Sequence, residues 1–158
     1  MALPGEKLTI GVAYRVNLDQ DPDLETVSVL DPPRSLIITD GDTSYRSREK
    51  WRVAEAWIGD VDHDGLAEII TLLDAADGRH LGLFAYFGGE YRERLVTQAL
   101  SPEPLSLLVI TRPPQEGGDF LLLVEKVKGG PSSVGEADSL RATFYRWNGF
   151  GFTAVNQP

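Results

Sequence analysis

Short runs of apolar and β-branched residues follow one another along this chain, and each ends at a turn signal. Sixteen glycines and ten prolines are spread over the whole length, and both residue types interrupt regular elements and favour turns. The runs occupy 8–16, 25–30, 35–39, 51–58, 68–73, 81–87, 105–111, 120–127, 140–147 and 151–155. Strand-length runs at such intervals predict an all-β fold. The run 51–58 also fits a short helix, but its position directly before an acidic loop favours a strand.

That acidic loop is the most specific motif in the chain, reading D-V-D-H-D-G-L-A-E over residues 60–68. Side chains at alternate positions of a tight loop can converge, and hard divalent cations such as calcium prefer oxygen ligands. Gly65 supplies the backbone freedom for the bend, whereas His63 occupies an intervening position and is expected to point into solvent. The predicted calcium ligands are Asp60, Asp62, Asp64, Glu68 and the carbonyl of Leu66. The alternative is a solvated Asp-Gly turn between strands.

The flanks of the loop separate it from an EF-hand. An EF-hand has a glutamate at position twelve and helices on both sides, but position twelve here is Thr71 and both flanks look like strands. Over roughly residues 53–91, the motif G-D-V-D-x-D-G-x-x-E-I-I is similar to the calcium loops of FG-GAP and VCBS repeats. Those families build β-propeller blades, as in integrin α-subunits and many bacterial surface proteins. The resemblance implies a calcium-binding blade that is secreted or at the cell surface, with a protein or glycan partner.

A degenerate copy of the loop lies 43 residues upstream. Its aligned positions are Asn17, Asp19, Asp21 and Glu25, in place of Asp60, Asp62, Asp64 and Glu68. Asparagine is a neutral oxygen ligand, but Pro22 stands where the first loop has glycine, and proline cannot take a positive φ. This segment is therefore either a second metal site of altered shape or a solvated acidic turn.

The repeat divides the single domain, residues 1–158, into three units of roughly 8–50, 51–98 and 99–158. In each unit an apolar run ends at a D-G, G-G or N-G turn and resumes with an aromatic residue, as in tight hairpins. Four antiparallel strands per unit fit the 40 to 50 residues of a propeller blade. The third unit lacks the acidic loop and contains a Gly/Ser/Pro-rich stretch, 128–138, that is expected to be mobile.

Three blades cannot close a propeller, which usually has four to eight, and they would leave two apolar faces uncovered. Two chains could pair into a six-bladed homodimer, the chain could belong to a longer protein, or the strands could form another compact β fold. We expect propeller-like blades, completed by dimerisation.

Charge and composition restrict the partners and the compartment. The net charge of −9 argues against nucleic acid and anionic membrane surfaces, and no run of 18 apolar residues predicts membrane insertion. The absence of cysteine excludes disulfides and thiolate metal sites. The first residues lack the apolar core of a signal peptide, so a secreted protein would require that the signal has been removed, and a cytoplasmic location is the alternative.

No motif predicts catalysis. The chain contains no G-x-S-x-G, P-loop or dinucleotide-binding sequence, so a non-catalytic module is expected. Two alternatives are a metal-dependent hydrolase that uses the acidic loop and a lectin-like propeller that stacks sugars on tryptophan. The tryptophans at 51, 57 and 147 also fit core packing. The charged segment 92–94 is expected to protect an exposed strand edge.

Overall fold

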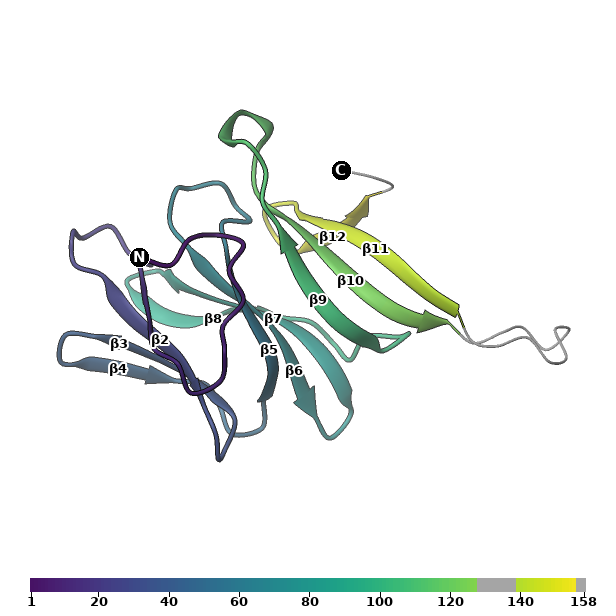
Figure 1. The fold of residues 1–158 in the computed structure, drawn as a ribbon, viewed down its shortest axis with the longest axis horizontal. Helices are drawn as coiled ribbons and strands as arrows, with labels where there is room; N and C mark the ends of the chain where they lie inside the picture. The colour runs from purple at the N-terminus through teal and green to yellow at the C-terminus, as the bar shows by residue number, and fades with distance from the viewer. Residues whose placement is uncertain (128–138, 156–158) are drawn as a thin grey trace, which may run out of the picture.

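The computed structural model describes residues 1–127 and 139–155, and these residues form twelve strands and one 3₁₀ turn, Pro114–Glu116, without an α-helix. The expected mobile stretch 128–138 lies outside the described residues. The strands form three four-stranded antiparallel sheets in chain order (Figure 1). The all-β prediction is therefore confirmed, and the run 51–58 is a strand. No helix in the described ranges is long and apolar enough to span a membrane.

Each sheet is a simple meander in which consecutive strands pair. Sheet 1 comprises β1 (Tyr14–Val16), β2 (Glu25–Leu30), β3 (Ser35–Asp40) and β4 (Thr43–Arg46). Sheet 2 comprises β5 (Arg52–Gly59), β6 (Glu68–Ala75), β7 (Gly78–Phe87) and β8 (Glu90–Val96). Sheet 3 comprises β9 (Pro104–Ile110), β10 (Phe120–Val127), β11 (Ser139–Trp147) and β12 (Phe152–Val155). The sheets occupy 14–46, 52–96 and 104–155, each within one of the three expected units.

Sheet 2 lies in the middle of the stack (Figure 1) and is covered on both faces. Successive side chains of a strand point to opposite faces. Ile69 and Leu73 of β6 join the hydrophobic cluster shared with sheet 1, whereas Ile70 and Leu72 join the cluster shared with sheet 3. This double burial explains why β6 reads as an unbroken apolar run, because a strand with only one buried face alternates with polar residues.

The two outer faces of the stack differ in chemistry. In sheet 1, Val27, Val29 and Ile38 point inward into the core, so the alternate positions form the outer face. Those positions include Arg15, Thr26, Ser28, Ser35, Thr39, Ser44 and Arg46, with Leu30 and Ile37 as apolar exceptions. The outer face of sheet 3 includes Leu108, Ile110, Leu122, Val124, Phe144 and Val155. The expectation of two apolar outer faces is therefore wrong for sheet 1, whose outward positions are mostly hydroxyl-bearing or charged.

The N-terminal run is shorter as a strand than the sequence predicted. Only Tyr14–Val16 of the run 8–16 is in β1. Residues 5–8 instead lie along the edge of β5, where the N–H of Leu8 donates to the carbonyl of Ala56 and the N–H of Ile58 donates to the carbonyl of Glu6. Leu8 thus packs into the cluster between sheets 1 and 2, whereas Ile10 and Val12 are exposed before the chain enters sheet 1.

The three connections between the first and second strands of the sheets lie beside one another. These connections are residues 17–24, 60–67 and 111–119. The N–H of Ala67 donates to the carbonyl of Asn17 at 3.0 Å, and the N–H of Asp119 donates to the carbonyl of Asp60 at 2.9 Å. The loop 60–67 is therefore tied by backbone to the loop of each neighbouring sheet, and the fold brings the two acidic segments together.

Candidate metal centres

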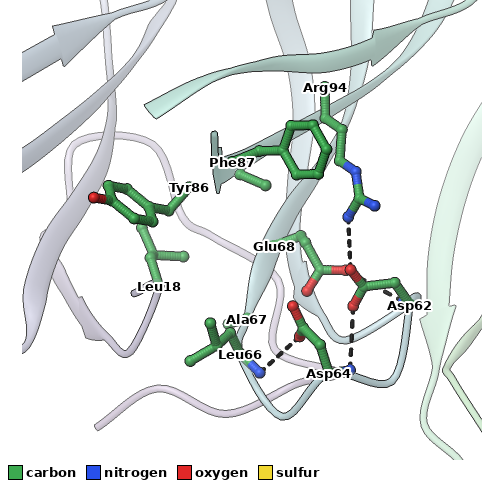
Figure 2. Close-up of a pocket in the computed structure, with 10 residues that line it drawn as sticks. Leu18, Asp62, Asp64, Leu66, Ala67, Glu68, Tyr86, Phe87 and Arg94 are labelled. Carbon is green, nitrogen blue, oxygen red and sulfur yellow. Dashed lines mark hydrogen bonds and ion pairs between the residues drawn. The ribbon is translucent and has the colours of Figure 1, made fainter. Parts of the chain in front are cut away.

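The first acidic loop leaves β5 and enters β6, and its four predicted carboxylates converge. One oxygen from each of Asp60, Asp62, Asp64 and Glu68 lies within 4.8 Å of the others. Figure 2 shows Asp62, Asp64 and Glu68 gathered around one point below Arg94. Oxygen donors at this separation match what a hard divalent cation requires. The structure thus brings together the four side-chain ligands that the sequence predicted.

The aspartates also fix the shape of the loop. The N–H groups of Asp64 and Gly65 donate to the two carboxylate oxygens of Asp60, at 3.2 and 3.1 Å. The N–H of Leu66 donates to Asp64 Oδ1 at 2.8 Å. Gly65 has φ of 85°, a left-handed conformation that glycine adopts without strain. These bonds fold the backbone around its own acids.

Glu68 is the most buried member of the cluster, with 2% exposure. Its Oε1 accepts from the N–H of Val61 at 3.0 Å, while its Oε2 is buried without a hydrogen-bond partner among the described residues. Burial, and after it the charges of Asp62, Asp60 and Asp64, raise the pKa of Glu68 to about 10 in the ion-free protein. A buried carboxylate oxygen needs a proton or a cation, and this one faces three further acids.

The aspartates titrate differently from one another. Burial, together with hydrogen bonding to Asp62 and the neighbouring charges, raises the pKa of Asp60 to about 6. Burial and the charge of Asp62 also raise the pKa of Asp64. Burial is the largest single influence on Asp62 and acts in the same direction, but the hydrogen bonds from Arg94, Asp64 and Asp60 and the charge of Arg94 together outweigh it, so the pKa of Asp62 lies below its ordinary value. The loop therefore binds excess protons when no cation is bound.

Arg94 on β8 connects this loop to sheet 3. Its Nη1 donates to Asp62 Oδ2 at 2.6 Å, and its guanidinium carbon lies 4.5 Å from the ring centroid of Phe87 and 5.0 Å from that of Trp147. The charged segment 92–94 was expected to protect an exposed strand edge. That expectation is wrong for Arg94, because its side chain is only 17% exposed and pairs with the acidic loop.

The upstream loop forms a second carboxylate cluster. One oxygen from each of Asp19, Asp21, Glu25 and Asp40 lies within 4.8 Å of the others. Asp40 is the last residue of β3. It was not predicted to join this cluster, because in the sequence it belongs only to a D-G turn. The Tyr91 hydroxyl, from β8, reaches Asp40 Oδ2 at 2.9 Å and Asp19 Oδ2 at 3.1 Å. This cluster therefore draws on both sheet 1 and sheet 2.

Two buried oxygens of the second cluster also lack partners. Glu25 is fully buried, and its Oε2 accepts from the N–H of Leu18 at 2.7 Å. Its Oε1 and the Oδ1 of Asn17 have no hydrogen-bond partner among the described residues. Burial, then the charges of Asp19, Asp40 and Asp21, raise the pKa of Glu25. In the described ranges the salt bridges include none to these four acids, whereas Asp62 in the first loop pairs with Arg94.

An open groove separates the two clusters. A cavity of about 470 Å³ is lined by both loops and by the end of β7, including Asp21, Asp64, Leu66, Tyr86 and Phe87. Tyr86 is 37% exposed and Phe87 47% exposed, so their rings form an accessible aromatic surface beside the acids. The sequence indicated only that both residues belong to a hairpin. Their position beside the acidic loops depends on how the sheets stack, which a local pattern does not specify.

The remaining predicted residues occupy the rim of the first loop. Leu66 is half-buried and lines the groove. His63 is exposed, as expected, and has φ of 60°.

Comparisons with protein-family models, with curated proteins and with solved structures found no match to this chain. The site is therefore interpreted from its own geometry.

Proposed function

We propose that this protein is a non-catalytic, calcium-binding β-repeat module whose ion-bound loops present a surface to a protein or glycan partner. The observation that carries the proposal is the unpartnered Oε2 of Glu68, buried among three aspartates. A cation at this point would satisfy the buried oxygen and remove the mutual repulsion of the acids. The residues that would hold it are Asp60, Asp62, Asp64 and Glu68, together with the carbonyl of Leu66.

Calcium fits this donor set best. All the candidate donors are oxygens, as hard cations prefer, and calcium accepts six to eight ligands in flexible geometry. Magnesium demands near-ideal octahedral geometry and usually keeps several waters, binding through one or two carboxylates, whereas this loop brings four carboxylates together. The second cluster, with Asp40 joining Asp19, Asp21 and Glu25, supports a second ion. Because Tyr91 contacts both Asp19 and Asp40, that ion would hold sheet 1 to sheet 2.

The sheets are proposed to be blades of a propeller-like stack. Each is a four-stranded meander, neighbouring sheets share one hydrophobic cluster, and the loops between the first and second strands form a continuous row. Blades of FG-GAP and VCBS repeats, which the first loop resembles, have this organisation. We place the protein outside the cell or at its surface, where millimolar calcium fills even weak sites.

The partner is proposed to contact the groove. Tyr86 and Phe87 give it exposed aromatic area, which stacks on a sugar ring or anchors a protein side chain. The tryptophans suit this role less well. Trp51 is 7% exposed and donates to Glu93, and Trp147 packs against Phe152 with a ring separation of 5.2 Å. The lectin alternative therefore rests on Tyr86 and Phe87.

Calorimetric titration of the chelated protein with calcium tests the proposal. We expect two bound ions, loss of one in Glu68→Gln and loss of the other in Glu25→Gln. The control Glu49→Gln removes the same charge at an exposed position after β4 and should retain both. At about 100 times Kd, one ion bound only to the folded state adds about 2.7 kcal/mol to the free energy of unfolding. Absence of both binding heat and a rise in Tm would overturn the proposal.

Two assays separate the alternatives. A glycan array probed with the wild type and with Tyr86→Ala distinguishes a lectin, whose signal the variant abolishes, from a protein-binding module, which gives no signal. The hydrolase alternative predicts metal-dependent turnover of a phosphoester or glycoside substrate that Asp62→Asn abolishes. Such turnover would contradict a non-catalytic role.

A further inference from the structure

The outer face of sheet 3 is an apolar surface that no other part of the described chain covers. Its central row runs across four strands as Leu108, Leu122, Phe144 and Val155, and each of these residues is half-buried. None of them belongs to either hydrophobic cluster of the stack. A flat apolar face of this kind on a protein surface marks an interaction site.

The charges on this face are unusual for the chain. The protein has 24 acidic residues, yet the described outward positions of β9–β12 include no aspartate or glutamate. The charged residues among these positions are Lys126 and Arg146, at opposite ends of β10 and β11. A second copy of the face would therefore approach without the repulsion that the net charge of −9 would otherwise create at contact.

The outer face of sheet 1 does not complement it. Packing sheet 3 of one chain on sheet 1 of the next would bury the hydroxyl groups of Thr26, Ser28 and Thr39 against leucine and phenylalanine. Burying such groups without hydrogen-bond partners is costly. This head-to-tail contact is also the one that a six-bladed ring of two chains would need. An isologous contact, in which the same face of each chain meets across a two-fold axis, instead joins apolar surface to apolar surface.

The size of the face is compatible with a dimer. Strands about 4.8 Å apart that rise about 3.4 Å per residue give four strands of this length a face of roughly 400 Å² in projection. The accessible area of a corrugated side-chain surface exceeds its projection, and stable interfaces bury about 800 Å² per partner. The face thus approaches the area of a standard interface.

We propose that the protein forms a two-fold symmetric homodimer in which the outer face of sheet 3 packs on the outer face of sheet 3 of a second copy. This inference goes beyond the proposed function and does not depend on calcium. The acidic loops and the groove lie at the ends of the strands, not on the outer face of sheet 3. The dimer contact therefore does not cover them. In this dimer the second copy covers the apolar face of sheet 3, which a closed six-bladed ring of two chains would otherwise have to cover.

Sedimentation of the full chain, with and without calcium, tests the dimer. We expect about twice the monomer mass of 17.4 kDa for the wild type in both buffers, and monomer mass for Leu122→Glu, which places like charges at the centre of the contact. The control Thr39→Glu puts the same charge on the outer face of sheet 1 and should remain dimeric. A monomeric wild type would overturn the proposal, and so would dissociation by Thr39→Glu.

Cross-linking keeps the test decisive if Leu122→Glu fails to fold. The chain contains no cysteine, so Leu122→Cys introduces one thiol at the centre of the face, close to the two-fold axis of any isologous contact that covers it. We expect mild oxidation to convert this variant to a covalent dimer at least ten times faster than Thr39→Cys. Equal rates would contradict the contact. A dimer without calcium binding, or the reverse, shows which of the two proposals has failed.

Discussion

At the scale of single residues, the chemistry of the first loop depends on how many protons its acids hold. Glu68 has a pKa of about 10 in the ion-free protein, against an ordinary 4.5, and Asp60 has a pKa of about 6, against 3.8. Below the ordinary values both groups are protonated in the folded and the unfolded chain. Between the ordinary and the raised values, the folded chain holds protons that the unfolded chain has released.

This difference predicts a pH dependence of stability. In chelator, the Glu68 contribution to the free energy of unfolding is fully present below pH 4.5 and is lost as the pH rises toward about 10. Glu68→Gln cannot titrate, so the Tm difference between Glu68→Gln and the wild type should grow in favour of the variant as the pH rises from 5 to 8. Thermal melts in chelator at several pH values measure it. Glu49→Gln is the control, and a constant difference for Glu68→Gln would refute the prediction.

Calcium should reverse the trend for the wild type. The ion binds ionised carboxylates and displaces the protons that the loop holds, so its affinity rises with pH. The Tm increase produced by a fixed calcium concentration should therefore be larger at pH 8 than at pH 6. A larger increase at pH 6 would contradict the assignment of Asp60 and Glu68 as ligands.

The four clustered carboxylates of the first loop could be predicted because they are local in sequence. Alternating aspartates in a tight loop converge whatever surrounds them, and Glu68 stands at the first position of the following strand. The partners Asp40, Tyr91 and Arg94 reach the clusters from other strands. Their contribution depends on which sheets stack and in which register, and no local pattern in one sequence specifies that.

At the scale of elements, the loop of sheet 3 supports the first acidic loop and contributes no carboxylate cluster of its own among the described residues. Asp119 is 6% exposed, and its Oδ2 accepts from the N–H of Asp60 at 2.9 Å while its Oδ1 accepts from the N–H of Arg112. The preceding residue, Gly118, passes so close to loop 60–67 that an added Cβ would lie 2.0 Å from the carbonyl oxygen of Val61. The third unit has thus lost its own acidic loop but holds that of the second.

Gly118→Ala should therefore separate the two loops. The new methyl group meets backbone, which cannot move aside as a flexible side chain can, and overpacking of this kind costs about 1–3 kcal/mol. We expect urea unfolding to show this loss, and the affinity for the calcium of the first loop to fall. Gly151→Ala is the matched control, because nothing lies within 4 Å of its added Cβ. Equal stability of the two variants would show that the loops do not need this contact.

Strand positions were predicted more accurately than strand ends. The run 68–73 became β6, extended by two residues to Ala75, because a strand buried on both faces has a strong apolar signal. The polar strand β8 (Glu90–Val96) was not among the apolar runs and was indicated only by the G-G turn and Tyr91. The run 8–16 formed only the short strand β1, because Leu8 lies along the edge of sheet 2 while Ile10 and Val12 are exposed. An apolar pattern does not show which sheet, if any, covers each residue.

At the scale of the whole molecule, sheet 2 makes the stack a single unit. Its strand β6 sends Ile69 to the cluster shared with sheet 1 and Ile70 to the cluster shared with sheet 3, so neither outer sheet has a core of its own. The sequence indicated three similar units and the apolar runs of their strands. It did not indicate that the outer face of sheet 1 is polar while that of sheet 3 is apolar. The residue pattern along a strand does not show which of its two faces another sheet covers.

The shared strand predicts that the outer sheets unfold together. Trp51 belongs to the cluster between sheets 1 and 2, and Trp147 packs against the cluster between sheets 2 and 3. In variants that keep only one of these tryptophans, with phenylalanine at the other two tryptophan positions, the fluorescence of the remaining tryptophan reports the unfolding of one sheet interface. At one fixed protein concentration in calcium, the urea transition of each fluorescence signal should coincide with that of the far-ultraviolet circular dichroism.

Truncation of β6 sharpens this test, because it weakens one interface directly. Ile70→Ala removes a fully buried side chain from the cluster shared with sheet 3 and should lower the free energy of unfolding by about 2–5 kcal/mol. If the stack is one cooperative unit, the midpoints reported by Trp51 and Trp147 fall by the same amount, although Trp51 lies on the other side of sheet 2. A fall confined to the Trp147 signal would mean that sheet 3 detaches on its own, and the acidic loop, tied to sheet 3 through Arg94 and Asp119, would then lose its support before the rest of the protein unfolds.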